Sequence, residues 1–212
     1  MAKGITREQI VTAALDLLDN EGMDALTVRA LASRLDVRAS ALYWHVRNKQ
    51  ELLDEMATEV MRRVAGALAA VPPGDGRRDG LTAYAGVLRS EYLLHRDGAR
   101  MFSGTRITDP AVVRMKEPSF ARWAASGWRP ADADDAIDLV TAFVVGFVIE
   151  EQEMRQAAGA DPSRYPIDQR DAWLGEGASL VKEAGHLHDE GDRRFQRLLG
   201  MILDGIGARP GV

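Results

Sequence analysis

The 212-residue chain contains no cysteine. Disulfides and thiolate metal sites are therefore excluded, which is compatible with a reducing cytoplasm. Aromatic residues make up only 6% of the chain, and its longest apolar stretch, residues 139–149, is too short to cross a bilayer. The N-terminus, MAKGITREQI, has no apolar signal-peptide core. We expect a cytoplasmic protein that does not enter the membrane, and the bias towards arginine, alanine and glycine suggests a GC-rich bacterial genome.

The chain is acidic overall, but one of its segments is cationic. The formal net charge is −5. Within residues 27–49, however, Asp36 is the single acid against five cations, a local net charge of +4. These cations are Arg29, Arg34, Arg38, Arg47 and Lys49. An acidic body with one cationic segment predicts that a single face meets a polyanion such as DNA.

The same segment predicts two short helices joined by a sharp turn. Its first helix has an apolar stripe at positions i, i+3, i+4 and i+7, formed by Val28, Leu31, Ala32 and Leu35. Asp36 tolerates the left-handed backbone that a tight interhelical turn requires. The second helix, roughly 38–46, can direct Leu42 and Val46 inward because they are four residues apart. This pattern predicts a helix-turn-helix unit.

Tyr43 and Trp44 fall on the exposed faces of that second helix. Their rings could contact thymine methyl groups or phosphates in the major groove of DNA. The alternative is that both rings cover the core of the unit.

Helical patterns continue along the rest of the chain, and no segment shows the alternation of a strand. We predict an all-α fold, with a three-helix DNA-binding domain at 1–48 and a larger helical ligand-binding and dimerisation domain at 49–212. Cap signals place one helix after residues 6–9 and a connecting helix at 49–70. Further helices are expected at 81–94, within 95–106, and at 110–126, 130–156, 167–185 and 192–207, with a loop at 157–166.

Two of these helices, 130–156 and 192–207, carry more apolar surface than a single contact explains. Such a surface favours a partner.

Several short motifs resemble one known family. The first 60 residues and the run LYWHVRNKQELLD at 42–54 are similar to the TetR family of repressors. HRDGAR at 95–100, GTR at 104–106 and GFVIEEQE at 146–153 resemble its tetracycline-binding members at matching separations. The resemblance implies a ligand-responsive transcriptional regulator that forms a homodimer through a four-helix bundle and leaves a palindromic operator in double-stranded DNA when an effector binds.

The resemblance also implies roles for residues in the DNA-binding domain. Arg29 matches an arginine that contacts guanine, for which the guanidinium fork is suited. Thr27 and Lys49 match phosphate contacts. The complete predicted DNA-binding set is Thr27, Arg29, Ala39, Ser40, Tyr43, Trp44, His45 and Lys49. Residues 39–41 differ from those members, which predicts a different operator sequence. For two residues of the set a purely structural role is the alternative: Thr27 could act only as a helix cap, and His45 could only bond a backbone group.

Internal aromatic residues of the second domain predict a small-molecule pocket. The predicted lining residues are Tyr84, Leu88, Met101, Phe102, Arg106, Val113, Phe143, Phe147 and Glu150. Arg106 and Glu150 match polar ligand contacts, although Glu150 could equally be a solvated helix residue. Ala65, Tyr84 and Phe102 stand where tetracycline-binding members have His, Asn and His, so Mg²⁺-bound tetracycline is disfavoured. A flatter, aromatic or apolar effector is expected instead.

Other functional classes have less support. His186 and His188 form a His-x-His pair, but a metal site needs a third ligand that the sequence does not provide. No nucleophile elbow or phosphate-binding glycine loop indicates an enzyme. A helical enzyme or a partner-binding adaptor using the C-terminal pocket is the alternative, and neither would require the cationic helix pair. We expect no cofactor and no bound metal.

Overall fold

The computed structural model describes residues 5–72, 74, 76–160, 166–186 and 191–208, and all regular elements within these ranges are helical. The predicted all-α fold is therefore confirmed. The helices are α1 (Arg7–Glu21), α2 (Val28–Arg34), α3 (Ala39–Leu42), α4 (Lys49–Ala70), α5 (Arg77–Leu93), α6 (Gly98–Phe102), α7 (Pro110–Arg114), α8 (Glu117–Ala125), α9 (Pro130–Ala160), α10 (Ile167–Leu174), the 3₁₀ turn η1 (Glu176–Ala178), α11 (Ser179–His186) and α12 (Gly191–Gly207).

Local signals determine the N-terminal helices. Thr6 and Gln9 form a reciprocal capping box at the start of α1, and Gly22 ends that helix at a φ of 82°. Asp36 has a φ of 51°, the left-handed conformation expected at the turn between α2 and α3. Leu42 and Val46 are fully buried, as their spacing predicts. The helix-turn-helix geometry therefore follows from residues close in sequence.

The second helix of the motif is shorter than the expected 38–46. Helix α3 ends at Leu42, and turn hydrogen bonds continue the chain, with the amide of Val46 donating to the carbonyl of Leu42 at 2.9 Å. The chain must then become extended at Asn48, whose side chain caps α4 by accepting from the amide of Glu51 at 2.9 Å. A longer helix would prevent that cap.

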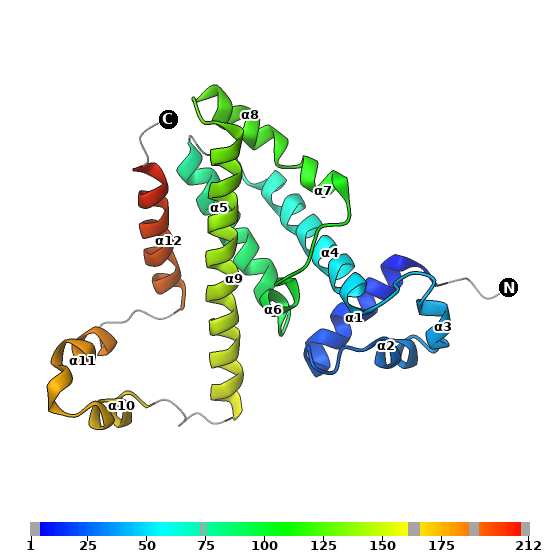
Figure 1. Cartoon of the computed structure of the whole chain (residues 1–212), viewed down its shortest axis with the longest axis horizontal. Coiled ribbons are helices and arrows are strands. Elements are labelled where there is room, and N and C mark those ends of the chain that lie inside the picture. The colour runs from blue at the N-terminus through cyan, green and yellow to red at the C-terminus, as the bar shows by residue number, and fades with distance from the viewer. Residues whose placement is uncertain (1–4, 73, 75, 161–165, 187–190, 209–212) are drawn as a thin grey trace.

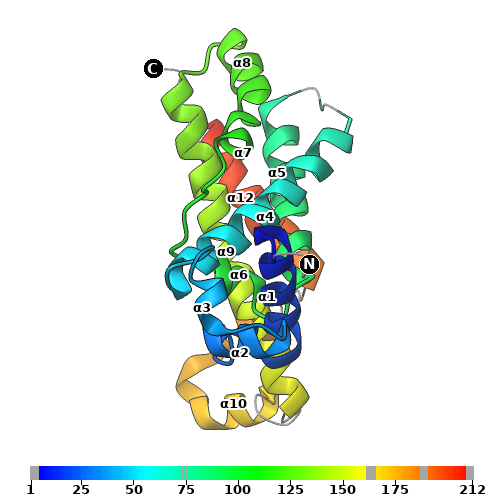
Figure 2. The same cartoon turned by 90° about the vertical axis from the view of Figure 1, so that its right-hand side faces the viewer.

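Helix α4 spans the predicted connecting segment and leads from the N-terminal unit into the body (Figure 1). In the body, α5 packs along the 31-residue α9, while α4 covers α5 and α12 lies against both α9 and α5. The side view shows α8 at one end of an elongated molecule and α10 at the other (Figure 2). A continuous core joins the DNA-binding unit to the body.

Several other expected bounds are wrong for local reasons. The helix expected at 110–126 is divided into α7 and α8, where Pro118 lies in the first turn of α8 and cannot donate a backbone hydrogen bond. The expected loop at 157–166 begins late because α9 continues to Ala160 through alanine-rich sequence. The helix expected at 167–185 is interrupted at Gly175, which has a φ of 65°.

Among the described residues, no helix is both long and apolar enough to cross a membrane.

Candidate functional site

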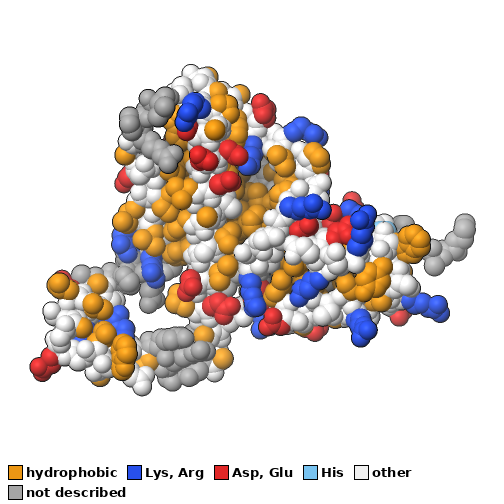
Figure 3. Space-filling view, viewed as in Figure 1, with side chains coloured by type: hydrophobic (Ala, Val, Ile, Leu, Met, Phe, Trp, Pro, Cys, Tyr) orange, Lys and Arg blue, Asp and Glu red, His pale blue; other side chains and the backbone are white. Residues whose placement is uncertain are grey.

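The surface of the helix-turn-helix unit combines cations with exposed aromatic rings. The side chain of Trp44 is 90% exposed and that of Tyr43 is 51% exposed, although both follow the fully buried Leu42. Arg29, Arg34 and Arg38 are also exposed. Lys and Arg side chains and a hydrophobic patch share this part of the surface (Figure 3). Large rings are costly to leave in water, so their presence beside cations favours a binding surface over core cover.

The other predicted DNA contacts also lie in this unit. Ser40 is exposed, Ala39 packs partly against the core, and His45 is half-buried. Thr27 caps α2 by accepting from the amide of Ala30 at 3.1 Å, so its structural role is present whether or not it meets a phosphate. Lys49 Nζ donates to the carbonyl of Met23 at 3.2 Å while the side chain remains exposed.

Arg7 holds the segment after α3 in place, a role that sequence reasoning missed. One terminal nitrogen of Arg7 donates to the carbonyl of His45 at 3.0 Å, and the other donates to the carboxylate of Glu55 at 2.9 Å. Arg7 thereby connects α1, α4 and the turn that carries Trp44. The partners are 38 and 48 residues away in sequence, so no local pattern could have indicated this role.

The segment HRD at 95–97 joins the DNA-binding unit to the body. His95 Nδ1 lies 3.0 Å from both carboxylate oxygens of Asp19 on α1, and the His95 side chain is only 7% exposed. Asp97 accepts from the amide of Met23 at 2.7 Å. On the other side, Gln152 of α9 donates to the carbonyl of His95 at 2.6 Å. The HRD segment therefore connects α9 to α1 through hydrogen bonds.

A second junction connects α4 to the loop after α6. The buried carboxylate of Asp54 accepts from the backbone amide and Nε of Arg106, both at 3.2 Å, and from Gln50 at 3.0 Å. The Arg106 side chain is 82% exposed and lines a small hollow of about 500 Å³ at this junction. Arg106 thus pairs with the protein rather than facing the interior of the body.

The remaining predicted ligand residues are divided between interior and surface. Leu88 and Met101 are buried, and Tyr84 and Phe102 are partly buried against the core. Val113 and Glu150 are exposed and do not join them. Tyr84 forms a 2.8 Å hydrogen bond with Thr141 of α9, and burial raises the pKa of the Tyr84 phenol.

Phe143 and Phe147 face α12 rather than α6. Their ring centroids lie 5.4 Å and 5.2 Å from that of Phe195 on α12. Arg89 stacks over Phe195 at 4.8 Å and forms an ion pair with the buried Glu151. This cluster locks α5, α9 and α12 together, so its first role is structural.

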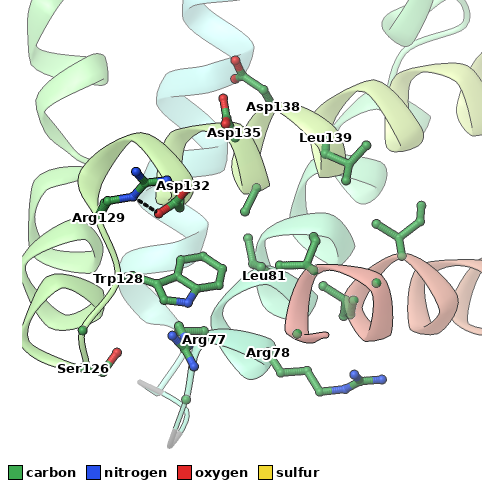
Figure 4. Close-up of a pocket in the computed structure, with 18 of the residues that line it drawn as sticks. Arg77, Arg78, Leu81, Ser126, Trp128, Arg129, Asp132, Asp135, Asp138 and Leu139 are labelled. Carbon is green, nitrogen blue, oxygen red and sulfur yellow. Dashed lines mark hydrogen bonds and ion pairs between the residues drawn. The ribbon is translucent and has the colours of Figure 1, made fainter. Parts of the chain in front are cut away.

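A hollow of about 1400 Å³ lies between the start of α5, the first part of α9 and the end of α12. Arg77 lies 4.6 Å from the ring centroid of Trp128, and Arg129 forms an ion pair with Asp132 at 2.7 Å, as the close-up shows (Figure 4). The exposed side chain of Leu139 forms part of the outer rim. None of the predicted ligand residues lines this hollow.

Residues 10–56 match the family model described as bacterial regulatory proteins of the tetR family, and residues 71–209 match the tetracyclin repressor-like C-terminal domain. The chain belongs to the TetR family. This TetR-family protein is a ligand-responsive, DNA-binding transcriptional repressor, and proteins of the family are not enzymes.

Individual relatives agree over most of the chain. The class C tetracycline repressor of Escherichia coli is 35% identical over 207 residues, which cover 95% of this chain and 90% of that protein. The Streptomyces coelicolor TetR-family protein ActR, solved in complex with actinorhodin, has a TM-score of 0.78 and 31% identity, covering 100% of this chain and 99% of that one. A TetR variant from Acinetobacter baumannii AYE, solved with minocycline, has a TM-score of 0.77 and 31% identity over 98% and 96%.

His188 lies outside the described residues, while His186 pairs with Asp171 at 2.7 Å. No group of three or more His, Asp or Glu side chains in the described part could hold a metal ion.

Proposed function

We propose that this TetR-family repressor acts as a homodimer that binds a palindromic operator through the surface formed by α2, α3 and the following turn. The observation that carries the proposal is the exposed pair Tyr43 and Trp44 beside exposed arginines on a helix-turn-helix unit. Arg29 supplies a fork for guanine, and Lys49 at the start of α4 supplies a phosphate contact. Selection of bound DNA from a random pool tests this directly. An inverted repeat with half-sites about one helical turn apart is expected, and recovery of unrelated sequences would refute the proposal.

The dimer interface proposed here uses the outer faces of α9 and α12. Leu139 on α9 is 50% exposed and Met201 on α12 is 64% exposed, and both border the 1400 Å³ hollow. A second copy would cover these side chains and hold the DNA-binding surfaces of the two copies at a fixed distance and orientation. The hairpin of α10 and α11 adds further exposed apolar residues, including Trp173 and Leu180.

The effector is proposed to bind inside the body near α5 and α6, in contact with Tyr84, Leu88 and Phe102. Two relatives of known structure were solved in complex with the polycyclic ligands minocycline and actinorhodin, which supports a polycyclic effector here. Tetracycline with Mg²⁺ should bind weakly, since Phe102 and Ala65 provide no nitrogen for the metal complex. A calorimetric titration that gave Mg²⁺-dependent, sub-micromolar binding would contradict this assignment.

We propose that effector binding releases DNA through two junctions between the body and the DNA-binding unit, the HRD segment at 95–97 and the Asp54–Arg106 pair. Effector contacts at α6 would shift the loop after α6, in which Arg106 is bound to Asp54 of α4. They would also shift the HRD segment, in which His95 is bound to Asp19 of α1. A tilt of α4 would then change the separation of the recognition surfaces. Because coupling between binding sites is reciprocal, saturating operator DNA must weaken effector binding by the factor with which effector weakens DNA binding. Equal effector affinity with and without operator would exclude this mechanism.

A further inference from the structure

One buried phenol in the body has no hydrogen-bond partner. Tyr92 is fully buried on α5, and its hydroxyl finds no partner among the described residues. Its ring centroid lies 5.2 Å from that of Phe102 on α6. Phenylalanine would fill nearly the same space without leaving a polar atom unsatisfied. A native protein that keeps such a group therefore calls for an explanation.

Tyr92 shares a face of α5 with predicted effector residues. Tyr84, Leu88 and Tyr92 are spaced four residues apart, so they form one row along the helix, with about 12 Å between the first and last Cα atoms. That length suits a flat molecule of two or three fused rings. Tyr92 was not predicted as a ligand contact, because an apolar position in a helical stripe indicates only core packing.

The hydrogen bonds of this row leave one proton uncommitted. The hydroxyl of Thr141 donates to the carbonyl of Ile137 at 2.8 Å. Since Thr141 has a single hydroxyl proton, its 2.8 Å bond with Tyr84 must be donated by the phenol of Tyr84. Tyr92 is then the phenol of the row whose proton is free. Burial raises the pKa of Tyr92, so this phenol remains a donor at neutral pH.

The fully buried Asp, Glu and His side chains of the described body are already committed to partners. Asp54 pairs with Arg106, His95 with Asp19 and Glu151 with Arg89, and Asp97 accepts from the amide of Met23. Outside this fully buried set, Glu91 Oε2 and Arg194 Nε are buried atoms without a partner among the described residues. A buried anion without a cation is strongly disfavoured. The inward end of a ligand should therefore be an uncharged acceptor.

We propose that Tyr92 donates a hydrogen bond to an uncharged carbonyl oxygen of a flat polycyclic effector, and so selects aromatic ketones or quinones over hydrocarbons of the same shape. This inference rests on the proposed effector site and adds its polar contact. Arg106 and Glu150, the polar contacts expected from the sequence, are both exposed.

The test compares 9-fluorenone with fluorene, tricyclic probes that differ by one carbonyl oxygen. Binding is followed by quenching of tryptophan fluorescence in the full-length wild type, Tyr92→Phe and Tyr84→Phe. The wild type should prefer fluorenone by about five- to tenfold, which corresponds to one neutral hydrogen bond. Tyr92→Phe should reduce this preference to near unity. Tyr84→Phe should retain it, because the proton of Tyr84 is committed to Thr141.

Thermal unfolding without ligand supplies a second readout. Tyr92→Phe should melt at the same or a higher temperature than the wild type, whereas Tyr84→Phe should melt lower because it loses a satisfied hydrogen bond. Absence of fluorenone binding, or a ketone preference that persists in Tyr92→Phe, overturns the inference. If the wild type still binds its selected operator, the proposed function survives that result; loss of operator binding would instead refute the proposed function.

Discussion

Arg29 and Lys49 are both exposed cations of the DNA-binding unit, but their chemistry predicts different effects. Arg29→Ala should cost roughly 1–3 kcal/mol of operator binding and relax the preference at one base pair, because a guanidinium fork contacts a base edge. Lys49→Ala should weaken binding to all sequences alike and lower the slope of log K against log salt by about one. Fluorescence anisotropy with operator and single-base variants measures both. Variants that bind like the wild type at moderate salt would show that the assigned contacts are wrong.

Asp54 and Arg106 form a pair whose members differ in burial. Asp54→Ala removes a buried acceptor of three hydrogen bonds, so the free energy of unfolding should fall by roughly 1–3 kcal/mol. Arg106→Ala should lower it by less than about 1 kcal/mol, since its side chain is largely solvated and its backbone amide still donates. Urea titration of the two variants decides the point. An equal or larger loss for Arg106→Ala would mean that its side chain is more important to the fold than its exposure indicates.

At the scale of the element, the turn between α2 and α3 depends on Asp36. Asp36→Ala places a residue with little tolerance for the left-handed region at a φ of 51° and should lower the free energy of unfolding by about 1 kcal/mol. Asp36→Asn removes the same charge but tolerates this backbone, so it is the matched control. Chemical denaturation should separate the two variants. Equal stability would show that loss of charge, rather than backbone strain, dominates.

Elements were predicted well wherever their ends carry local chemistry. Asn48 and Gly22 cap α4 and α1 at the residues that their side-chain properties indicate. Helix α3 was predicted too long because its apolar pair, Leu42 and Val46, is equally buried by a helix or by consecutive turns. Helical spacing alone cannot distinguish these, since the choice depends on where the next helix begins.

For the whole molecule, the proposed dimer makes the apolar faces of α9 and α12 essential. Leu139→Glu or Met201→Glu would bury a carboxylate in that interface and should raise the dimer dissociation constant by at least about tenfold, with a matching loss of operator affinity. Met115→Glu, at a similarly exposed methionine after α7, is the control. Sedimentation equilibrium measures the dimer. A wild type that remains monomeric at micromolar concentration would remove this interface from consideration.

The sequence alone determined the helices, the cationic unit and the exposure of Trp44, because caps, helical periodicity and local charge involve residues close in the chain. Tertiary structure decided which side chains contact one another and which polar groups have hydrogen-bond partners. It paired Arg106 with Asp54, turned Phe143 and Phe147 towards Phe195, and left the Tyr92 hydroxyl without a partner. These outcomes depend on how α4, α5, α6, α9 and α12 pack, and a hydrogen bond between residues some 50 positions apart leaves no trace in local sequence spacing.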